Sequence, residues 1–238
     1  MTRPGLIDSG GAHSDVDGGP EVVLETQGLS RWYGPVAALE RLDLVVRAGE
    51  CVAVMGPNGS GKTTAAELIC GLREPTAGWA RVCGHSVHRE PEAVAARRKL
   101  AFVPDTPLLY ADLSVLDHLR LVAAAHGAAD EGFTEQAEHL LDLFDLTERA
   151  TFLPPQLSRG MRQKTALACA LVRPYSLLVL DEPVVGLDAR AVTALAGMIH
   201  DTVAAGSAVL LLTHSETFAA RVCTRSIHID EGKVLDLE

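Results

Sequence analysis

The sequence predicts an α/β fold in which a mostly parallel sheet is covered by helices, and three observations point to it. Short apolar runs bounded by Gly and Pro recur along the chain, as expected of buried strands. Such runs alternate with helical periods in the last third of the chain. One run leads through a glycine-rich segment directly into a helix, which gives a strand–loop–helix unit.

Three strands are predicted first, followed by a helix and two further strands. Turns at Tyr33-Gly34-Pro35 and Ala48-Gly49 separate the first three strands. The predicted strands are Val22–Leu29, Arg41–Arg47, Cys51–Met55, Ala80–Cys83 and Leu100–Val103, and the helix is Lys62–Gly71.

The middle of the chain is helical, and strands and helices alternate after it. The predicted helices of the middle are Ser114–His126, Thr134–Leu146 and Ser158–Val172. After them come strand Leu177–Leu180, helix Ala189–Ala205, strand Ala208–Leu212, helix Glu216–Cys223, and strands Ser226–Ile229 and Lys233–Leu237. The helical middle is therefore predicted to be an insertion into an α/β core.

Composition excludes several classes of protein. With 238 residues the chain can build one sizeable core or two small domains. Its 21 Lys and Arg against 31 Asp and Glu give a net charge of −10, which argues against a nucleic-acid partner. No apolar run approaches the length of about 18–20 residues that a membrane span needs.

The cysteines and the N-terminus give two further expectations. The five cysteines are an odd number without a CxxC pair, so we expect isolated reduced thiols rather than zinc ligands or disulfides. Residues 1–20 are rich in Gly, Asp and Ser and contain no apolar signal segment. We therefore expect a disordered leader there.

The glycine-rich segment has the pattern G-x-x-x-x-G-K-T of a phosphate-binding P-loop. Its backbone N–H groups and the start of the next helix would face phosphate oxygens, whereas the alternative is a turn with no ligand. Lys62 would reach the β- and γ-phosphates, and the Thr63 hydroxyl would bind Mg²⁺. The predicted nucleotide contacts are Gly56, Pro57, Asn58, Gly59, Ser60, Gly61, Lys62, Thr63 and Thr64.

Two adjacent acids follow an apolar strand, as in the second half of a P-loop site. Asp181 is predicted to bind Mg²⁺, and Glu182 is predicted to orient or deprotonate an attacking water. His214 follows a later strand and is placed to bond the γ-phosphate or that water. Glu182, His214 and Lys62 are the predicted catalytic residues, and the alternative is that the acids are solvated and the histidine is structural.

These residues and four further segments resemble the ATP-binding cassette of ABC transporters over residues 21–238. Leu157–Gln163 is similar to the family's LSGGQ-x-Q signature, and Asp181-Glu182-Pro183 with Gly186-Leu187-Asp188 is similar to its Walker B and D-loop. Leu212-Thr213-His214 looks like the family's switch histidine. Tyr33 lies where the family places an aromatic ring on adenine, and Trp32 is the competing residue.

The resemblance implies a P-loop NTPase (RecA-like) core with an N-terminal antiparallel β subdomain and an α-helical subdomain inserted at roughly residues 106–172. It further implies a Mg²⁺-dependent ATPase that forms a head-to-tail dimer, with a second copy or a different cassette, around ATP. Ser158 and Gly160 would contact the nucleotide of the opposite subunit, and Asp188 would also belong to the nucleotide site.

Three positions depart from the family pattern. Arg159 replaces the first glycine of the signature, and Met161 replaces its glutamine. Asp105 stands where the family usually has a glutamine that contacts Mg²⁺ and the membrane-domain interface. The Asp105 carboxylate is predicted to bind Mg²⁺ or to make a different contact with the partner.

The resemblance places the chain on the cytoplasmic face of the cell membrane, bound to separate transmembrane permease subunits. The segment Pro107–Val115 would receive the permease, and the departures are most like drug- or polypeptide-type exporters. One alternative is a soluble cassette ATPase that acts on ribosomes, DNA or Fe–S assembly. Another is a regulator that binds ATP without hydrolysing it.

Overall fold

The structure is a computed structural model that describes residues 20–235. Its ten strands within this range form one sheet. The order is β5-β4-β1-β2-β10-β9-β3-β8-β7-β6. The strand bounds are Val22–Tyr33 (β1), Val36–Arg47 (β2), Cys51–Met55 (β3), Ala77–Val82 (β4), His85–Ser86 (β5), Leu100–Val103 (β6), Leu177–Asp181 (β7), Ala208–Thr213 (β8), Arg225–Asp230 (β9) and Lys233–Leu235 (β10). Residues 1–19 of the predicted leader and the last two of the predicted final strand lie outside this range.

The central strands β3, β8, β7 and β6 are parallel neighbours and are buried on both faces. Alternate residues face opposite sides, so Leu178 and Leu180 pack into one core while Leu177 and Val179 pack into the other. This double burial explains why the sequence shows continuous apolar runs rather than alternation. The predicted α/β class with a P-loop core is confirmed.

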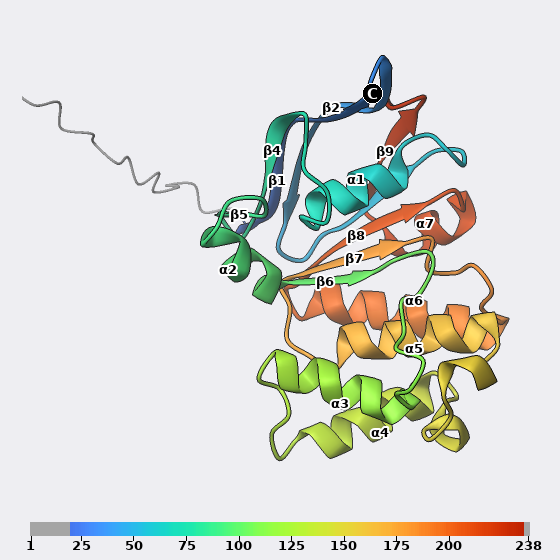
Figure 1. The fold of residues 1–238 in the computed structure, drawn as a ribbon. Coiled ribbons are helices and arrows are strands. Elements are labelled where there is room, and N and C mark those ends of the chain that lie inside the picture. The colour runs from blue at the N-terminus through green and yellow to red at the C-terminus, as the bar shows by residue number, and fades with distance from the viewer. Residues whose placement is uncertain (1–19, 236–238) are drawn as a thin grey trace, which may run out of the picture.

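The parallel strands separate the two cores, and helices cover both faces of these strands (Figure 1). α1 (Lys62–Ile69) lies between the parallel strands and the β1–β2–β4 layer, whereas α5 and α6 cover the other face and α3 and α4 lie beyond them. The remaining helix bounds are Glu92–Lys99 (α2), Val115–Ala125 (α3), Phe133–Leu143 (α4), Arg159–Leu171 (α5), Ala189–Ala204 (α6) and Glu216–Val222 (α7). Short 3-10 turns span Thr147–Arg149 and Pro154–Gln156.

The β1–β2 hairpin is longer than the sequence predicts. Both strands continue to a tight turn at Gly34 and Pro35, whereas the apolar pattern ends at Leu29 and resumes at Arg41. The register of the pair shifts at several points between Thr26 and Trp32, which breaks the alternation on which the prediction depends. The turns lie at Gly34-Pro35 and Ala48-Gly49 as expected, except that Tyr33, predicted in the first turn, belongs to β1.

Sequence patterning also missed α2 and the short strand β5. Only Ala93 and Ala96 of α2 are buried, and its last turn is Arg97-Arg98-Lys99, so the helix shows no apolar stripe. Among residues 20–235 no helix has the length and apolar character needed to cross a membrane.

All five cysteines are free thiols, but two of them are not isolated from each other as expected. The Sγ atoms of Cys51 and Cys223 lie 3.1 Å apart. The sequence hides this contact because the residues are 172 positions apart and meet only when β3 pairs with β9.

Candidate functional site

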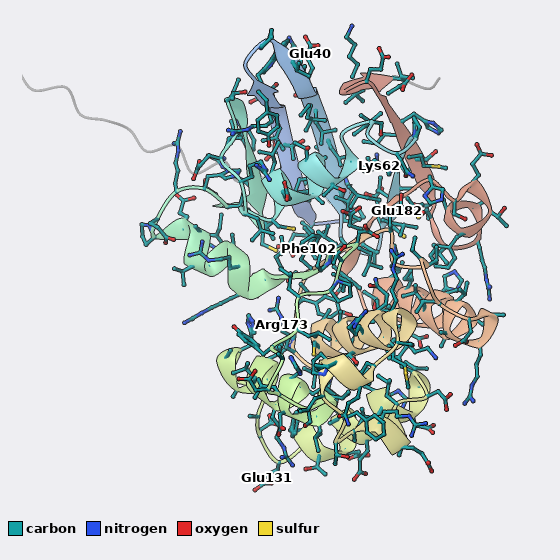
Figure 2. The ribbon with its side chains drawn as sticks, turned by 45° about the vertical axis from the view of Figure 1, so that its right-hand side comes forward. Glu40, Lys62, Phe102, Glu131, Arg173 and Glu182 are labelled. Carbon is teal, nitrogen blue, oxygen red and sulfur yellow. The ribbon has the colours of Figure 1, made fainter. Side chains whose placement is uncertain are left out.

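The ends of three parallel strands bring the predicted site residues together. The register aligns Met55 at the end of β3 with Thr213 on β8, and Asp181 at the end of β7 with Leu212. The segments that follow the strands therefore meet at one edge of the sheet, as ligand sites of α/β proteins do. In Figure 2 the labelled side chains of Lys62 and Glu182 meet at this edge.

The P-loop passes so close to its neighbours that two of its glycines have no room for a side chain. A Cβ atom on Gly56 would lie 2.1 Å from the backbone oxygen of Ile229, and one on Gly61 would lie 2.3 Å from that of Ala38. Gly61 also has a φ of +112° at the start of α1. The loop is thus a close-packed backbone cradle at a helix N-terminus, the arrangement that binds phosphate.

The Lys62 ammonium lies inside this cradle. Its Nζ donates to the backbone oxygens of Gly56 and Pro57 at 2.8 and 3.0 Å, and it lies 3.4 Å from Oε1 of Glu182. The side chains of Lys62 and Glu182 are only 6% and 10% exposed, so each charge offsets the desolvation of the other.

The Glu182 carboxylate is oriented from its other side by β8. Its Oε2 accepts from the Thr213 hydroxyl at 3.1 Å and lies 2.9 Å from Nδ1 of His214. Glu182 has a φ of +46°, which turns the chain at the strand end. The structure thus joins the predicted Lys62, Glu182 and His214 into one contact chain, and adds Thr213, which sequence reasoning missed.

Asp181 is completely buried beside this chain of contacts, and neither of its carboxylate oxygens has a hydrogen-bond partner. Burial raises the pKa of Asp181 to about 6, and the charges of Glu182 and Asp105 act in the same direction. The Thr63 hydroxyl and Lys62 act in the opposite direction. Two buried carboxylate oxygens without hydrogen-bond partners are suitable ligands for a divalent cation.

These residues fit Mg²⁺ held through phosphate oxygens and water. Within residues 20–235 no three His, Cys, Asp or Glu side chains gather to hold a metal alone. Mg²⁺ typically keeps several waters and few protein ligands, so the fit depends on Thr63 and Asp181 beside a bound phosphate.

A cavity of about 240 Å³ lies over the P-loop. It is lined by six of the nine P-loop residues predicted to contact the nucleotide, together with the predicted metal ligand Asp105 and the predicted catalytic Glu182; the six are Asn58, Gly59, Gly61, Lys62, Thr63 and Thr64. Ala38, which sequence reasoning missed, lines it as well, since β2 passes against Gly61. The Ser60 side chain points away into a buried position, where its Oγ has no hydrogen-bond partner.

Asp105 lies at the rim of this cavity and pairs with a residue of α5. Its Oδ1 is 3.9 Å from the Arg159 guanidinium, and both side chains are partly exposed. Two of the three departures from the family pattern therefore contact each other. This pairing was not visible in the sequence, because 54 positions separate the two residues.

Ser158, Gly160 and Asp188 lie away from the cavity of their own chain. Ser158 is exposed and caps α5 by accepting from the backbone N–H of Met161 at 3.2 Å, as its position in the sequence predicts. Asp188 caps α6 and pairs with Lys164 on α5 at 2.8 Å. The hydrogen bond from Lys164 lowers the pKa of Asp188, so this carboxylate stays ionised.

The structure separates the two candidate adenine-stacking rings. Trp32 lines a groove on the outer side of the β1–β2–β4 layer. Tyr33 lies against the Arg31 and Arg73 guanidinium groups, 4.8 and 5.7 Å from its ring centre, and Arg73 follows α1. The contact with Arg73 places Tyr33 on the α1 side of the layer, where its side chain is 44% exposed.

The strand–loop–helix cradle, its buried lysine and the acids at the end of β7 define a P-loop nucleoside triphosphatase. Comparison with known proteins then gives the family. The family model described as ABC transporter matches residues 39–185, and the chain belongs to this family. It is therefore an ATP-binding cassette and an ATPase.

Curated relatives and solved structures agree with this assignment. The chain is 34% identical over 212 residues to the Nod factor export ATP-binding protein I of Cupriavidus metallidurans, covering 89% of this chain and 69% of that protein. It is 33% identical over 213 residues to the SkfA peptide export ATP-binding protein SkfE of Bacillus subtilis, covering 90% and 87%. The structure of an ATP-binding subunit of an ABC transporter matches with a TM-score of 0.83 and 38% identity, covering 89% and 88%. A dimeric bacterial ABC transporter cassette matches with a TM-score of 0.82 and 26% identity, covering 90% and 97%.

The tight approach at Gly61 gives a test of the cradle. We expect Gly61→Ala to weaken ATP binding by about tenfold or more, because the added methyl group pushes the loop away from Ala38. Gly206→Ala is the matched control: Gly206 also has a positive φ, of +87°, but nothing lies within 4 Å of its Cβ position. A fluorescent ATP analogue measures both affinities, and unchanged affinity in Gly61→Ala contradicts this account of the loop.

Proposed function

We propose that the chain hydrolyses Mg²⁺-bound ATP in a head-to-tail dimer and drives export through separate membrane subunits. The observation that carries the hydrolytic part is the buried Glu182 carboxylate, held between Lys62 and His214 at the rim of the P-loop cavity. Three side chains from three segments converge there, each suited to one task in phosphoryl transfer.

In this proposal the P-loop N–H groups and the Lys62 ammonium bind the β- and γ-phosphates. Lys62 then exchanges its bonds to the Gly56 and Pro57 oxygens for phosphate oxygens. Glu182 orients the attacking water and accepts its proton. Thr213 and His214 hold Glu182 in place, and His214 faces the γ-phosphate.

Thr63 and Asp181 would hold Mg²⁺, and Asp105 would approach it from the cavity rim. When bound, the ion neutralises charge on the phosphate oxygens. The unpartnered Asp181 oxygens support this assignment. The Arg159 pairing supports the second role predicted for Asp105, a contact outside the metal.

The proposal of a dimer is supported by predicted nucleotide contacts that do not line the P-loop cavity of their own chain. Ser158 opens α5, and the free N–H groups of a helix start attract a phosphate. Ser158 and Gly160 do not line the cavity of their own chain, so their nucleotide contact would lie across a dimer interface. Asp188 would take its part in the nucleotide site at the same interface, and the similarity to a dimeric cassette supports this arrangement.

The proposal of export through permease subunits is supported by the names of the relatives and by one exposed apolar surface. Two relatives carry export in their names, which favours a transporter subunit over a soluble cassette that acts on ribosomes, DNA or Fe–S assembly. Leu108 and Tyr110, at 87% and 66% exposure, form an apolar surface beside Asp105 on the segment predicted to receive the permease. Docking there would hold the chain on the cytoplasmic face of the membrane.

Removing the charge of Glu182 tests hydrolysis. We expect Glu182→Gln to slow ATP turnover by about 10²–10⁴ and to leave ATP binding intact, because the amide keeps the shape of the carboxylate but cannot accept the proton. Steady-state phosphate release measures the rate, with Glu90→Gln, an exposed ion-pair residue, as control. Unchanged turnover would remove Glu182 from the mechanism, and loss of turnover would exclude a regulator that never hydrolyses.

A charge at Ser158 tests the dimer. In the Glu182→Gln background, ATP should convert the chain to a dimer in light scattering. Ser158→Asp should keep it monomeric, because aspartate still caps α5 but repels the γ-phosphate of the opposite subunit. Ser158→Thr keeps the cap without the charge and should still dimerise. Dimers of Ser158→Asp with ATP would rule out this role of the signature helix.

A charge on the apolar surface tests docking. We expect Leu108→Asp to lower the share of the tagged chain that sediments with membranes of its native cells by about tenfold, since an aspartate cannot be buried in an apolar contact. Leu72→Asp is the control, because Leu72 is an exposed leucine (66%) in the segment after α1 and outside the predicted docking segment. Equal sedimentation of both variants would show that the permease does not use this surface.

A further inference from the structure

Two cysteines meet at a point that the nucleotide site does not use. The Sγ atoms of Cys51, the first residue of β3, and Cys223, the residue after α7, are 3.1 Å apart. A disulfide joins its sulfurs at about 2.05 Å, so a shift of about 1 Å closes the gap. All five cysteines of the described part of the chain are free thiols, and Cys70, Cys83 and Cys169 make no such contact with another sulfur there.

Hydrogen bonds between the backbone segments of the two cysteines hold these segments next to each other. The backbone N–H and the hydroxyl of Thr224, the residue next to Cys223, donate to the backbone oxygen of Cys51 at 2.9 and 3.1 Å. The parallel ladder between β3 and β9 continues from there, with Val52 opposite Arg225. The backbone pairing therefore holds the two cysteines side by side, within reach of each other's sulfur.

The two thiols differ in their access to solvent. Cys51 is completely buried, whereas Cys223 is half-buried and lines a cavity of about 330 Å³ together with Met55, Arg225 and His228. A small oxidant can thus reach Cys223 first. The contact with Cys223 and burial raise the pKa of the Cys51 thiol far above its usual range. Cys51 is therefore a protonated thiol as long as Cys223 is reduced.

We propose that Cys51 and Cys223 are a reversible disulfide-forming pair that responds to peroxides. In the first step the Cys223 sulfur attacks hydrogen peroxide, the O–O bond breaks, and a sulfenic acid and one water form. In the second step the Cys51 sulfur attacks the Cys223 sulfur, the S–OH bond breaks, the S–S bond forms, and the thiol proton of Cys51 joins the leaving hydroxide as a second water. Two thiols lose two electrons and one peroxide gains them, and a dithiol reductant reverses the change.

The bridge would connect two segments that lead to the nucleotide site. β3 runs from Cys51 to Met55 and enters the P-loop, and α7 begins directly after His214 and Ser215. Closing a loop of more than 170 residues restricts the unfolded chain. The oxidised protein should therefore unfold at a temperature several degrees higher than the reduced one.

Peptide mapping tests the pair, because cleavage after Lys and Arg places each of the five cysteines on its own peptide. The purified full chain is treated with hydrogen peroxide, its remaining thiols are alkylated in denaturant, and the tryptic peptides are identified by mass. We expect most of the molecules to contain the peptide of Cys51 joined to Val222–Arg225 and to lose this link in dithiothreitol. Cys70, Cys83 and Cys169 should be alkylated.

Two variants make the result decisive. Cys223→Ser should abolish both the linked peptide and the rise in unfolding temperature, whereas Cys83→Ser should keep both. Because Cys223 is only half-buried, its replacement should leave the reduced protein folded, which a melting curve checks. Alkylation of all five cysteines after peroxide, oxidation of Cys223 to a sulfinic acid without a link, or bonds only between two molecules would overturn the proposal.

Discussion

Burial of the Glu182 carboxylate is the constraint on which the arrangement of the site depends. A charge with so little access to water is stable only when neighbouring groups compensate it. Here α1 supplies Lys62, and the end of β8 supplies Thr213 and His214. The compensation therefore holds three separate segments at fixed positions, and it succeeds because β3, β7 and β8 end in register at one edge of the sheet.

Much of this site was predictable from the sequence, because its parts are local. The P-loop and the acids after an apolar strand are short patterns, and Ser158 is recognisable as a helix cap. Contacts across the fold were not predictable. Thr213 looks like any strand-end threonine until β8 lies beside β7, and Ala38 gains its place only through the packing of β2 against Gly61.

In the fold, too, the elements with a local sequence pattern were predictable and those that depend on distant contacts were not. The apolar runs of β3, β7 and β8 are visible because both faces of these strands are buried. The far ends of β1 and β2 depend on pairing within a bulged hairpin, and α2 buries only two alanines, so neither has a strong local pattern. Asp105 and Arg159 show the limit most clearly: the sequence gives two residues of opposite charge that depart from the family pattern, and only the structure reveals that they are adjacent.

The close packing of Gly160 has a mechanical consequence. A Cβ atom there would lie 2.3 Å from the backbone oxygen of Gly186, and four residues further along α5 Lys164 holds Asp188, the residue that begins α6. The start of α5 is thus joined at two points to the segment that leads into α6, once by backbone contact and once by charge. A displacement of the start of α5 therefore acts directly on the loop after Glu182 and on the first residue of α6.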